Sequence, residues 1–443
     1  MRVAAPRPGS RPGVLGRIWH RLRNFGILDG IWTAAASFGS KIQALVALGI
    51  GGRMGDVEGL GLFVLATSIA ILTCSTADLG LSSHVVRAYA SGGVRERRAL
   101  LPQLAIRLAI SVPLAVAAAL AIAAIRGDIA DPLLWVGMIT LYSAAYLASL
   151  LVTQMAYGMG RFRGGATLNG AVRTATIPLL LAVSFTGANP LVLLGVLAVG
   201  ELLIAVLQYR KAPATNPVEP GAPIGLGVRQ SWRLGIGPIV NTVMSRSDTV
   251  IISGIASSRA LGVYGVASQV ENALTTAALI PAGASMTYAA RTTDPDQARR
   301  HRRTVGLIVA LSYAVIGVPM FIFAGPLTEL VLGVTLEDLT PVRVLVVAGL
   351  FSSLGSVAMK IITGQGRQNT VAGIWLATAG VTLVAMFTGA YLAGALGAAI
   401  GAGVRDLAFF TLTWLAVRRT PMDAAFPEPR EAAALQASDN QVI

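Results

Sequence analysis

Apolar stretches of about 20 residues recur along almost the whole chain, separated by short polar loops. A helix needs about 20 residues to cross the roughly 30 Å hydrocarbon core of a membrane, so each stretch is long enough to span one. Only 13% of the 443 residues are charged, whereas soluble domains carry roughly 25%. The sequence therefore predicts an integral membrane protein, because too little charge remains to cover the surface of a soluble one.

Twelve of these stretches are predicted to cross the membrane as helices. They are far longer than the roughly 9–11 residues of a membrane β-strand, and they show no sustained period-two alternation. The predicted spans are 27–50, 59–82, 101–125, 132–156, 167–187, 190–209, 234–255, 260–286, 304–325, 342–363, 370–391 and 394–416. The predicted fold class is an all-α polytopic membrane protein.

Positive charge is confined largely to alternate loops, which predicts the orientation of the chain. Arginine and lysine gather before the first span and after each even-numbered span, as at Arg97, Arg98 and Arg300. The loops on the other side carry acids such as Asp128 and Glu337. Basic loops remain in the cytoplasm, so both termini are predicted to be cytoplasmic. The net charge of +14 then faces anionic membrane lipids, and no nucleic-acid partner is needed to explain it.

A proline-rich segment at 212–227 divides the predicted spans six and six. It separates two helical lobes that have polar segments at their outer ends. The predicted parts are a basic amphipathic cytoplasmic leader (1–26), an N-terminal six-helix lobe (27–209), a cytoplasmic linker (210–233), a C-terminal six-helix lobe (234–417) and a disordered cytoplasmic tail (418–443).

The two halves of the sequence resemble each other at three matching positions. Gly59-Leu-Gly-Leu-Phe-Val-Leu-Ala66 matches Ala260-Leu-Gly-Val-Tyr-Gly-Val-Ala267 at an offset of 201. Val112-Pro113 matches Val318-Pro319, and Gly158-Met-Gly-Arg161 matches Gly364-Gln-Gly-Arg367, both at an offset of 206. Since each half has an even number of spans, the repeats are parallel and enclose a central cavity. This is the architecture of a transporter.

Charged side chains inside the predicted spans mark candidate functional positions, because each costs about 2.5–3.5 kcal/mol to insert. The deepest are Lys41, Arg246, Asp248 and Glu271. Arg246 and Asp248 are two residues apart and do not share a helix face, so their partners are expected on other helices. Lys41 and Glu271 are the nearest candidates by depth. Glu201, Arg405 and Asp406 are also inside spans, and the sequence assigns them no role.

Two functions are predicted for these charges beside simple pairing between helices. Lys41 and Arg246 are predicted to form a cationic site for an anionic substrate group, because the planar guanidinium binds two phosphate oxygens at once. Asn241 and Asn272 would add hydrogen bonds. Asp248 or Glu271 would carry a coupling proton, because a carboxyl group in a low-dielectric cavity is able to exchange one near neutral pH.

No metal site, cofactor or catalytic constellation is expected. Cys74 is the only cysteine, so the chain has no intramolecular disulfide and no cysteine-based metal site. His20, His84 and His301 are widely separated in the sequence and do not suggest a histidine cluster.

The sequence resembles the oligosaccharide flippases of the multidrug/oligosaccharidyl-lipid/polysaccharide exporter superfamily. The resemblance runs from about Gly26 to Arg419. It is clearest in Gly59-Leu-Gly-Leu-Phe, Ala77-Asp-Leu-Gly-Leu-Ser-Ser-His-Val-Val-Arg87, Ser247-Asp-Thr-Val-Ile-Ile-Ser, Leu261-Gly-Val-Tyr264 and Gly364-Gln-Gly-Arg367. It implies two six-helix lobes around a V-shaped cavity and alternating access in the bacterial inner membrane.

The resemblance further implies an undecaprenyl-diphosphate-linked oligosaccharide as substrate, for O-antigen, capsule or exopolysaccharide biosynthesis. Basic cavity residues would contact the diphosphate, a role carried over to Lys41 and Arg246, with Arg87 at the cytoplasmic mouth. Membrane lipids and other polysaccharide assembly proteins are the implied partners.

Three alternatives remain open from the sequence. A multidrug cation antiporter of the same fold should favour acidic over basic cavity residues, whereas here Lys41 and Arg246 offset Asp248 and Glu271. A peptidoglycan-precursor flippase usually has fourteen spans rather than the twelve predicted here. A membrane-bound glycosyl or acyl transferase needs a carboxylate or histidine constellation at a membrane face, and the sequence offers none. A transporter rather than an enzyme is therefore predicted.

Overall fold

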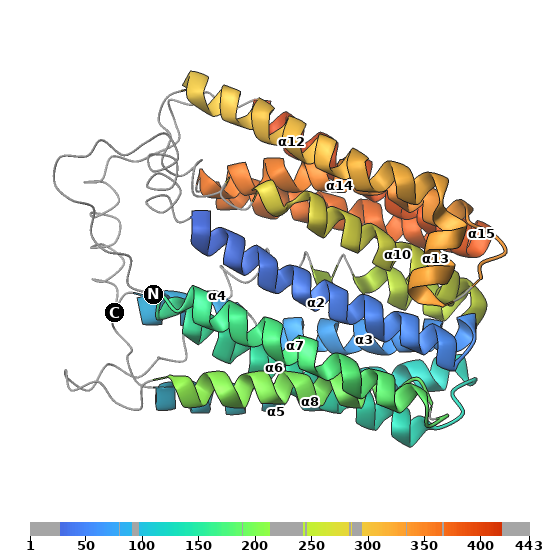
Figure 1. Cartoon of the computed structure of the whole chain (residues 1–443). Helices are drawn as coiled ribbons and strands as arrows, with labels where there is room; N and C mark the ends of the chain where they lie inside the picture. The colour runs from blue at the N-terminus through green and yellow to red at the C-terminus, as the bar shows by residue number, and fades with distance from the viewer. Residues whose placement is uncertain are drawn as a thin grey trace.

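The structure is a computed structural model of the chain. It describes residues 27–78, 80–90, 97–187, 189–212, 242–243, 246–282, 285, 295–333, 335–365 and 367–418. The described residues form helices and the turns between them, without a strand (Figure 1). The leader, most of the linker and the tail predicted from the sequence lie outside these ranges.

The first half of the described chain holds seven α-helices and one 3₁₀ turn. They are α2 (Ile27–Met54), α3 (Val57–Asp78), α4 (Leu81–Ala90), η1 (Arg97–Ala99), α5 (Leu100–Arg126), α6 (Pro132–Gly158), α7 (Phe162–Ser184) and α8 (Val192–Lys211). The second half holds a helix at 246–255, then α10 (Ser258–Ala278), η2 (Ile280–Ala282), α12 (Pro295–Ile322), α13 (Ala324–Leu332), α14 (Thr340–Gly364) and α15 (Gln368–Arg418).

The predicted spans that fall in the described ranges correspond to these helices, including a division inside α15. Span 234–255 is described only from 246 onwards, apart from 242–243. Eight of the described helices have the length and composition to cross a membrane, and α15 counts once among them although it holds two. Its backbone leaves the helical region at Ala393 and Gly394, between predicted spans eleven and twelve. The two arms fold back on each other, since a Cβ on Gly389 would overlap the carbonyl oxygen of Gly397, and one on Gly401 would overlap that of Ala385. Small residues allow this close backbone approach inside a membrane.

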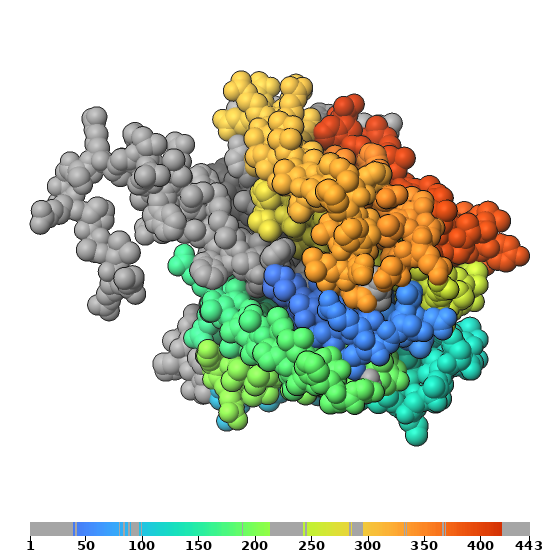
Figure 2. All heavy atoms as spheres, turned by 45° about the vertical axis from the view of Figure 1, so that its right-hand side comes forward, coloured from blue at the N-terminus to red at the C-terminus, as the bar shows by residue number. Residues whose placement is uncertain are grey.

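The helices pack as two lobes. α2, α3 and α5 to α8 pack against one another, and α10, α12, α14 and α15 form a second group. Figure 1 shows the first group in blue and green below the second in yellow to red. The lobes meet mainly where α3 packs on α10 and α13 packs on α2. In Figure 2, α2 follows this boundary with the orange segment above it.

The contact between α3 and α10 joins positions that are equivalent in the two repeats. Gly61 and Gly262 lie 201 residues apart, which is the offset of the repeat, and they face each other. A Cβ on Gly61 would lie 2.7 Å from the Gly262 nitrogen and 2.9 Å from the Ser258 carbonyl oxygen. A Cβ on Gly262 would overlap the carbonyl oxygen of Val57, the counterpart of Ser258. The contact is therefore self-complementary, as a two-fold axis between the lobes requires.

Polar contacts reinforce the same end of the interface. Arg126, the last residue of α5, forms an ion pair with Asp128 at 2.7 Å and also donates to the hydroxyl of Ser258 in the other lobe. Ser258 in turn donates to Asp128 at 2.7 Å. On the other side of the interface, Arg53 donates to the carbonyl oxygen of Leu330 at 3.0 Å. We refer to this end, where α3, α6 and α10 begin, as the closed end.

Substituting Gly262 with a larger residue should separate the lobes at the closed end. Gly262→Ala places a methyl group against the Val57 backbone, and overpacking of this kind costs about 1–3 kcal/mol. Spin labels on Asp131→Cys and Glu337→Cys, in a chain with Cys74→Ala, should show a longer distance in the Gly262→Ala variant. Gly137→Ala is the matched control, because a Cβ there meets nothing within 4 Å. An unchanged label distance would contradict the tight α3–α10 contact.

The closed end should also loosen in acid. The hydrogen bond from Arg126 lowers the pKa of Asp128, assisted by Ser258 and opposed by partial burial. A lowered pKa means that the ion pair contributes stability above the ordinary carboxyl value of about 4 and loses it as pH falls through the shifted value. The same label pair should therefore separate below about pH 4, and Asp128→Asn should give that longer distance already at neutral pH. A wild-type distance that is constant down to about pH 2 would refute this role.

Candidate functional site

A pocket lies between the lobes at the middle depth of the membrane. Arg246 lines it from the second lobe, nine residues before its helix ends at 255. At 1.5 Å per residue this is about 14 Å from the closed end, or half of a hydrocarbon core. The lining is Gln43, Ala44, Ala47, Leu48, Phe63, Val64, Thr67, Ile71, Tyr142, Tyr146, Arg173, Leu197, Glu201, Arg246 and Gln269.

The first-lobe wall of the pocket carries a paired charge. Arg173 on α7 forms an ion pair with Glu201 on α8 at 2.9 Å. Ser149 on α6 donates to the other oxygen of Glu201. Nearby, Gln43 on α2 donates to the hydroxyl of Thr176 at 2.6 Å. Glu201 is thus bonded from two helices, as a buried carboxylate in a membrane has to be.

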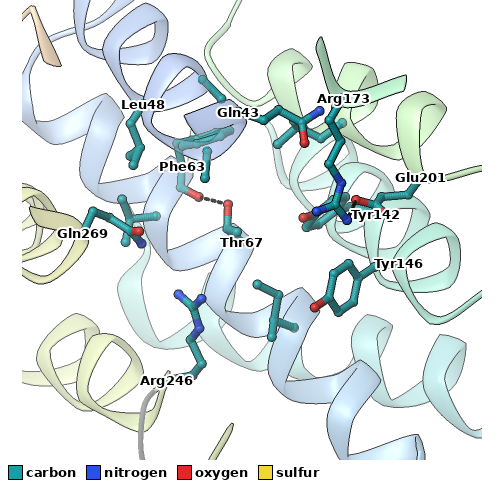
Figure 3. A pocket seen from close by; sticks show the side chains of 15 residues that line it. Gln43, Leu48, Phe63, Thr67, Tyr142, Tyr146, Arg173, Glu201, Arg246 and Gln269 are labelled. Atoms are coloured by element: carbon teal, nitrogen blue, oxygen red, sulfur yellow. Dashed lines mark hydrogen bonds and ion pairs between the residues drawn. The ribbon is translucent and has the colours of Figure 1, made fainter. Parts of the chain in front are cut away.

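Arg246 faces this wall from the other lobe. Figure 3 shows its guanidinium directed into the pocket, with Gln269 to one side and Tyr146 opposite. Within the described part of the chain, Arg246 makes no ion pair, whereas Arg173 and Glu201 neutralise each other. The charged lining groups therefore leave one positive charge, and the site is arranged to receive an anion.

A second pocket lies inside the second lobe and is acidic. Arg405 on α15 is bonded to Asp406 at 2.8 Å and is 3.7 Å from Asp248 and 3.9 Å from Glu271. The Tyr264 hydroxyl donates to Asp248 at 2.7 Å. All four charged residues line this pocket, so three carboxylates surround one guanidinium.

The structure divides the residues that the sequence singled out between these two pockets. Arg246 lines the pocket between the lobes, whereas Asp248, Glu271 and Asn272 line the acidic pocket. Asn272 donates to the Ser268 carbonyl oxygen within α10 at 2.8 Å. The side chains of Lys41 and Arg87 and the whole of Asn241 lie outside the described part of the structure. Lys41 itself falls in α2, two positions before the lining residue Gln43, and Arg87 falls in α4.

Several important side chains were missed or left unassigned by the sequence. Arg173 is a charge inside predicted span 167–187, so its depth alone could have marked it. Glu201 was recognised as an intramembrane charge, but its partner was not. For Asp248 the expected partner on another helix is Arg405 at 3.7 Å. The expected partner of Arg246, Glu271, lies 3.9 Å from Arg405 instead. Pairing depends on how each helix is rotated, which the sequence does not state.

The arrangement of the helices matches solved transporters of the MOP superfamily. The structure of the lipid II flippase MurJ in an inward closed conformation has a TM-score of 0.67 at 11% identity, covering 88% of each chain. An inward-facing multidrug-resistance MATE transporter gives 0.62 at 13% identity, covering 86% of this chain and 94% of its own. A MOP transporter from Pyrococcus furiosus, whose binding pocket is described as having reverse polarity, gives 0.60 at 14% identity, with 88% and 94% covered.

These similarities establish the fold, a multi-pass bundle of about 12 membrane helices in two lobes around a central cavity. No curated protein matches the sequence. The model of the family described as polysaccharide biosynthesis protein matches residues 28–288, more than half of the 443 residues. The chain belongs to this family.

Arg405 should be essential to the stability of the second lobe. Removing one partner from a buried ion-pair cluster typically costs about 3–5 kcal/mol, because the remaining charges are left uncompensated. Arg405→Ala should therefore lower the unfolding temperature in detergent strongly, as followed by tryptophan fluorescence. Adding Asp248→Asn and Glu271→Gln to that variant should restore much of the loss. An Arg405→Ala protein as stable as the wild type would show that the cluster does not depend on this cation.

Proposed function

We propose that this protein is a flippase that moves an undecaprenyl-diphosphate-linked oligosaccharide repeat unit across the bacterial inner membrane, for O-antigen, capsule or exopolysaccharide biosynthesis. Membership of the polysaccharide biosynthesis family supports a substrate of this kind. The observation that carries the proposal is Arg246, an intramembrane guanidinium directed into the pocket between the lobes.

The diphosphate is the part of such a substrate that most needs a protein partner inside a membrane. A doubly charged group has a large desolvation cost, which a fixed guanidinium offsets with two parallel hydrogen bonds. Arg246 takes this role, with Gln269 and Gln43 as further hydrogen-bonding groups on opposite walls.

Three residues from the sequence prediction complete the proposed path. Lys41 adds a second positive charge at the depth of Gln43, and Arg87 attracts the diphosphate at the cytoplasmic mouth. Asn241 supplies a hydrogen bond on the second-lobe side, whereas Asn272 lines the acidic pocket and is left out of this path. In this orientation both termini are cytoplasmic and the closed end faces the outer side of the membrane. The substrate then enters the pocket from the cytoplasmic leaflet and leaves it after the lobes separate at the closed end.

The acidic pocket supports a further part of the proposal, a coupling proton on Asp248 or Glu271. Three carboxylates around Arg405 leave an excess of negative charge, which a bound proton reduces. The same excess is the one observation that favours the alternative of a multidrug cation antiporter. The two functions differ in cargo, because a cation would be attracted to the acidic pocket and repelled by Arg246.

Transport in proteoliposomes tests the substrate and the site together. Arg246→Ala should reduce flipping of a fluorescent undecaprenyl-diphosphate oligosaccharide by about tenfold or more, the effect of losing one charge-assisted hydrogen-bonded contact. Arg246→Lys should retain part of the rate, and Arg300→Ala is a control, because it removes an exposed charge far from the pocket.

Two outcomes of this assay would contradict the proposal. If a correctly inserted Arg246→Ala protein flips the substrate at the wild-type rate, Arg246 does not bind the diphosphate. Efflux of a hydrophobic cation, without flipping of the oligosaccharide lipid, would favour the antiporter. An imposed pH gradient in the same vesicles tests coupling: the wild-type rate should respond to it, and the rate of Asp248→Asn or Glu271→Gln should not.

A further inference from the structure

We propose that the pocket formed by the α6–α7 turn and the end of α8 binds the phosphate group of an anionic phospholipid. This pocket is at the opposite end of the molecule from the closed end and is separate from both sites described above. Its lining is Ala156, Met159, Gly160, Arg161, Arg163, Gly164, Gly165, Leu168, Gln208, Lys211 and Ala212.

The turn that forms the pocket is built around a glycine. Gly160 has a φ of 71°, in the left-handed region that glycine adopts without strain. Its nitrogen donates to the Tyr157 carbonyl oxygen at 2.9 Å, and Tyr157 stacks on Phe162 with ring centroids 5.4 Å apart. Arg161 donates to the carbonyl oxygen of Lys211, the last residue of α8, at 2.5 Å. These contacts hold the end of α8 beside the start of α7 and leave a basic hollow between them.

The charge of this hollow suits a phosphate. Arg161, Arg163 and Lys211 are exposed, and no acidic residue lines it within the described ranges. α7 begins here without a side-chain cap, so the positive end of its dipole faces the same space. A Cβ on Gly160 or Gly164 would meet nothing within 4 Å, so an anion is able to approach the backbone closely. Charge, helix dipole and access all favour a bound anion.

The position of the hollow identifies the anion as part of a lipid. α7 and α8 are both long and apolar enough to cross a membrane, and the hollow lies where α7 begins and α8 ends. The phosphate of a phospholipid lies at this level, where a membrane helix leaves the hydrocarbon core. Basic pockets at the ends of membrane helices are typical sites for anionic headgroups.

The equivalent turn in the second lobe shows that the fold does not require these charges. There Arg367, the counterpart of Arg161, donates to the Ala416 carbonyl oxygen at the end of α15 at 3.1 Å. Ala416 thus stands where the first lobe has Lys211, and Asn369 stands where it has Arg163. The turn arginine is common to both lobes and is structural. The cation at the end of α15, Arg418, instead lies over the Trp414 ring at 5.3 Å from its centroid, so the pair of Arg163 and Lys211 at one turn is particular to the first lobe and points to a ligand there.

Native mass spectrometry of the delipidated full-length protein with phosphatidylglycerol or phosphatidylcholine tests this site. The variant Arg163→Asn/Lys211→Ala carries the residues of the second lobe and keeps Arg161, so the turn should still fold. The wild type should bind phosphatidylglycerol preferentially, and the double variant should bind it about 30-fold more weakly, as expected for two cations near a membrane surface. Arg300→Asn/Arg303→Ala removes two exposed cations from α12 and should bind like the wild type.

Three results would overturn the proposal. Equal binding of phosphatidylglycerol by the double variant and the wild type would show that the pocket is not the site. An equal loss of phosphatidylglycerol binding in the α12 control variant would show that binding depends only on the net charge of the protein. Inorganic phosphate that competes fully at millimolar concentration with a short-chain phosphatidylglycerol would assign the pocket to a free anion rather than a lipid. Thermal unfolding in phosphatidylcholine, which should be equal in all three proteins, verifies that each is folded.

Discussion

A charge inside a membrane has to be paired or to face a cavity, and the two lobes meet this requirement in different ways. In the first lobe Glu201 is bonded by Arg173 and Ser149, and the nearby pocket retains the positive charge of Arg246. In the second lobe one guanidinium, Arg405, serves three carboxylates. Because the desolvation of an unpaired ion costs several kcal/mol, these clusters restrict how each helix can rotate. The positions of both pockets follow from that restriction.

The two lobes share their framework and differ in their surfaces. Arg161 and Arg367 each donate to a carbonyl oxygen in the last turn of the final helix of their lobe. Pro113 and Pro319 lie inside equivalent helices, α5 and α12. Outside these shared positions the lobes diverge, in the charges of their pockets and in the cations near the turns. Repetition thus accounts for the arrangement of helices, and divergence accounts for the sites.

The sequence predicts the fold far better than the sites. Hydropathy alone located the spans, and even the division of α15 at Ala393 and Gly394 falls between two predicted spans. The depth of a charge along its helix could also be read, which marked Arg246, Asp248 and Glu271. Which charges meet depends on helix rotation and on packing across the chain, so the roles of Arg173 and Arg405 emerge only in three dimensions. The closeness of Gly61 to Gly262 likewise needed the structure, although the matched segments were visible as a repeat.

The contact of Gly61 with Gly262 indicates how a chain with two repeats could arise. Its two sides are the same position in each repeat, so one surface is complementary to itself. A self-complementary surface pairs two copies without any second surface having to evolve, which is how most symmetric dimers are built. Two copies of a six-helix polypeptide with this glycine would therefore pair through the same surface. Joining two such genes end to end would convert that dimer into a single chain, whose halves were then free to diverge.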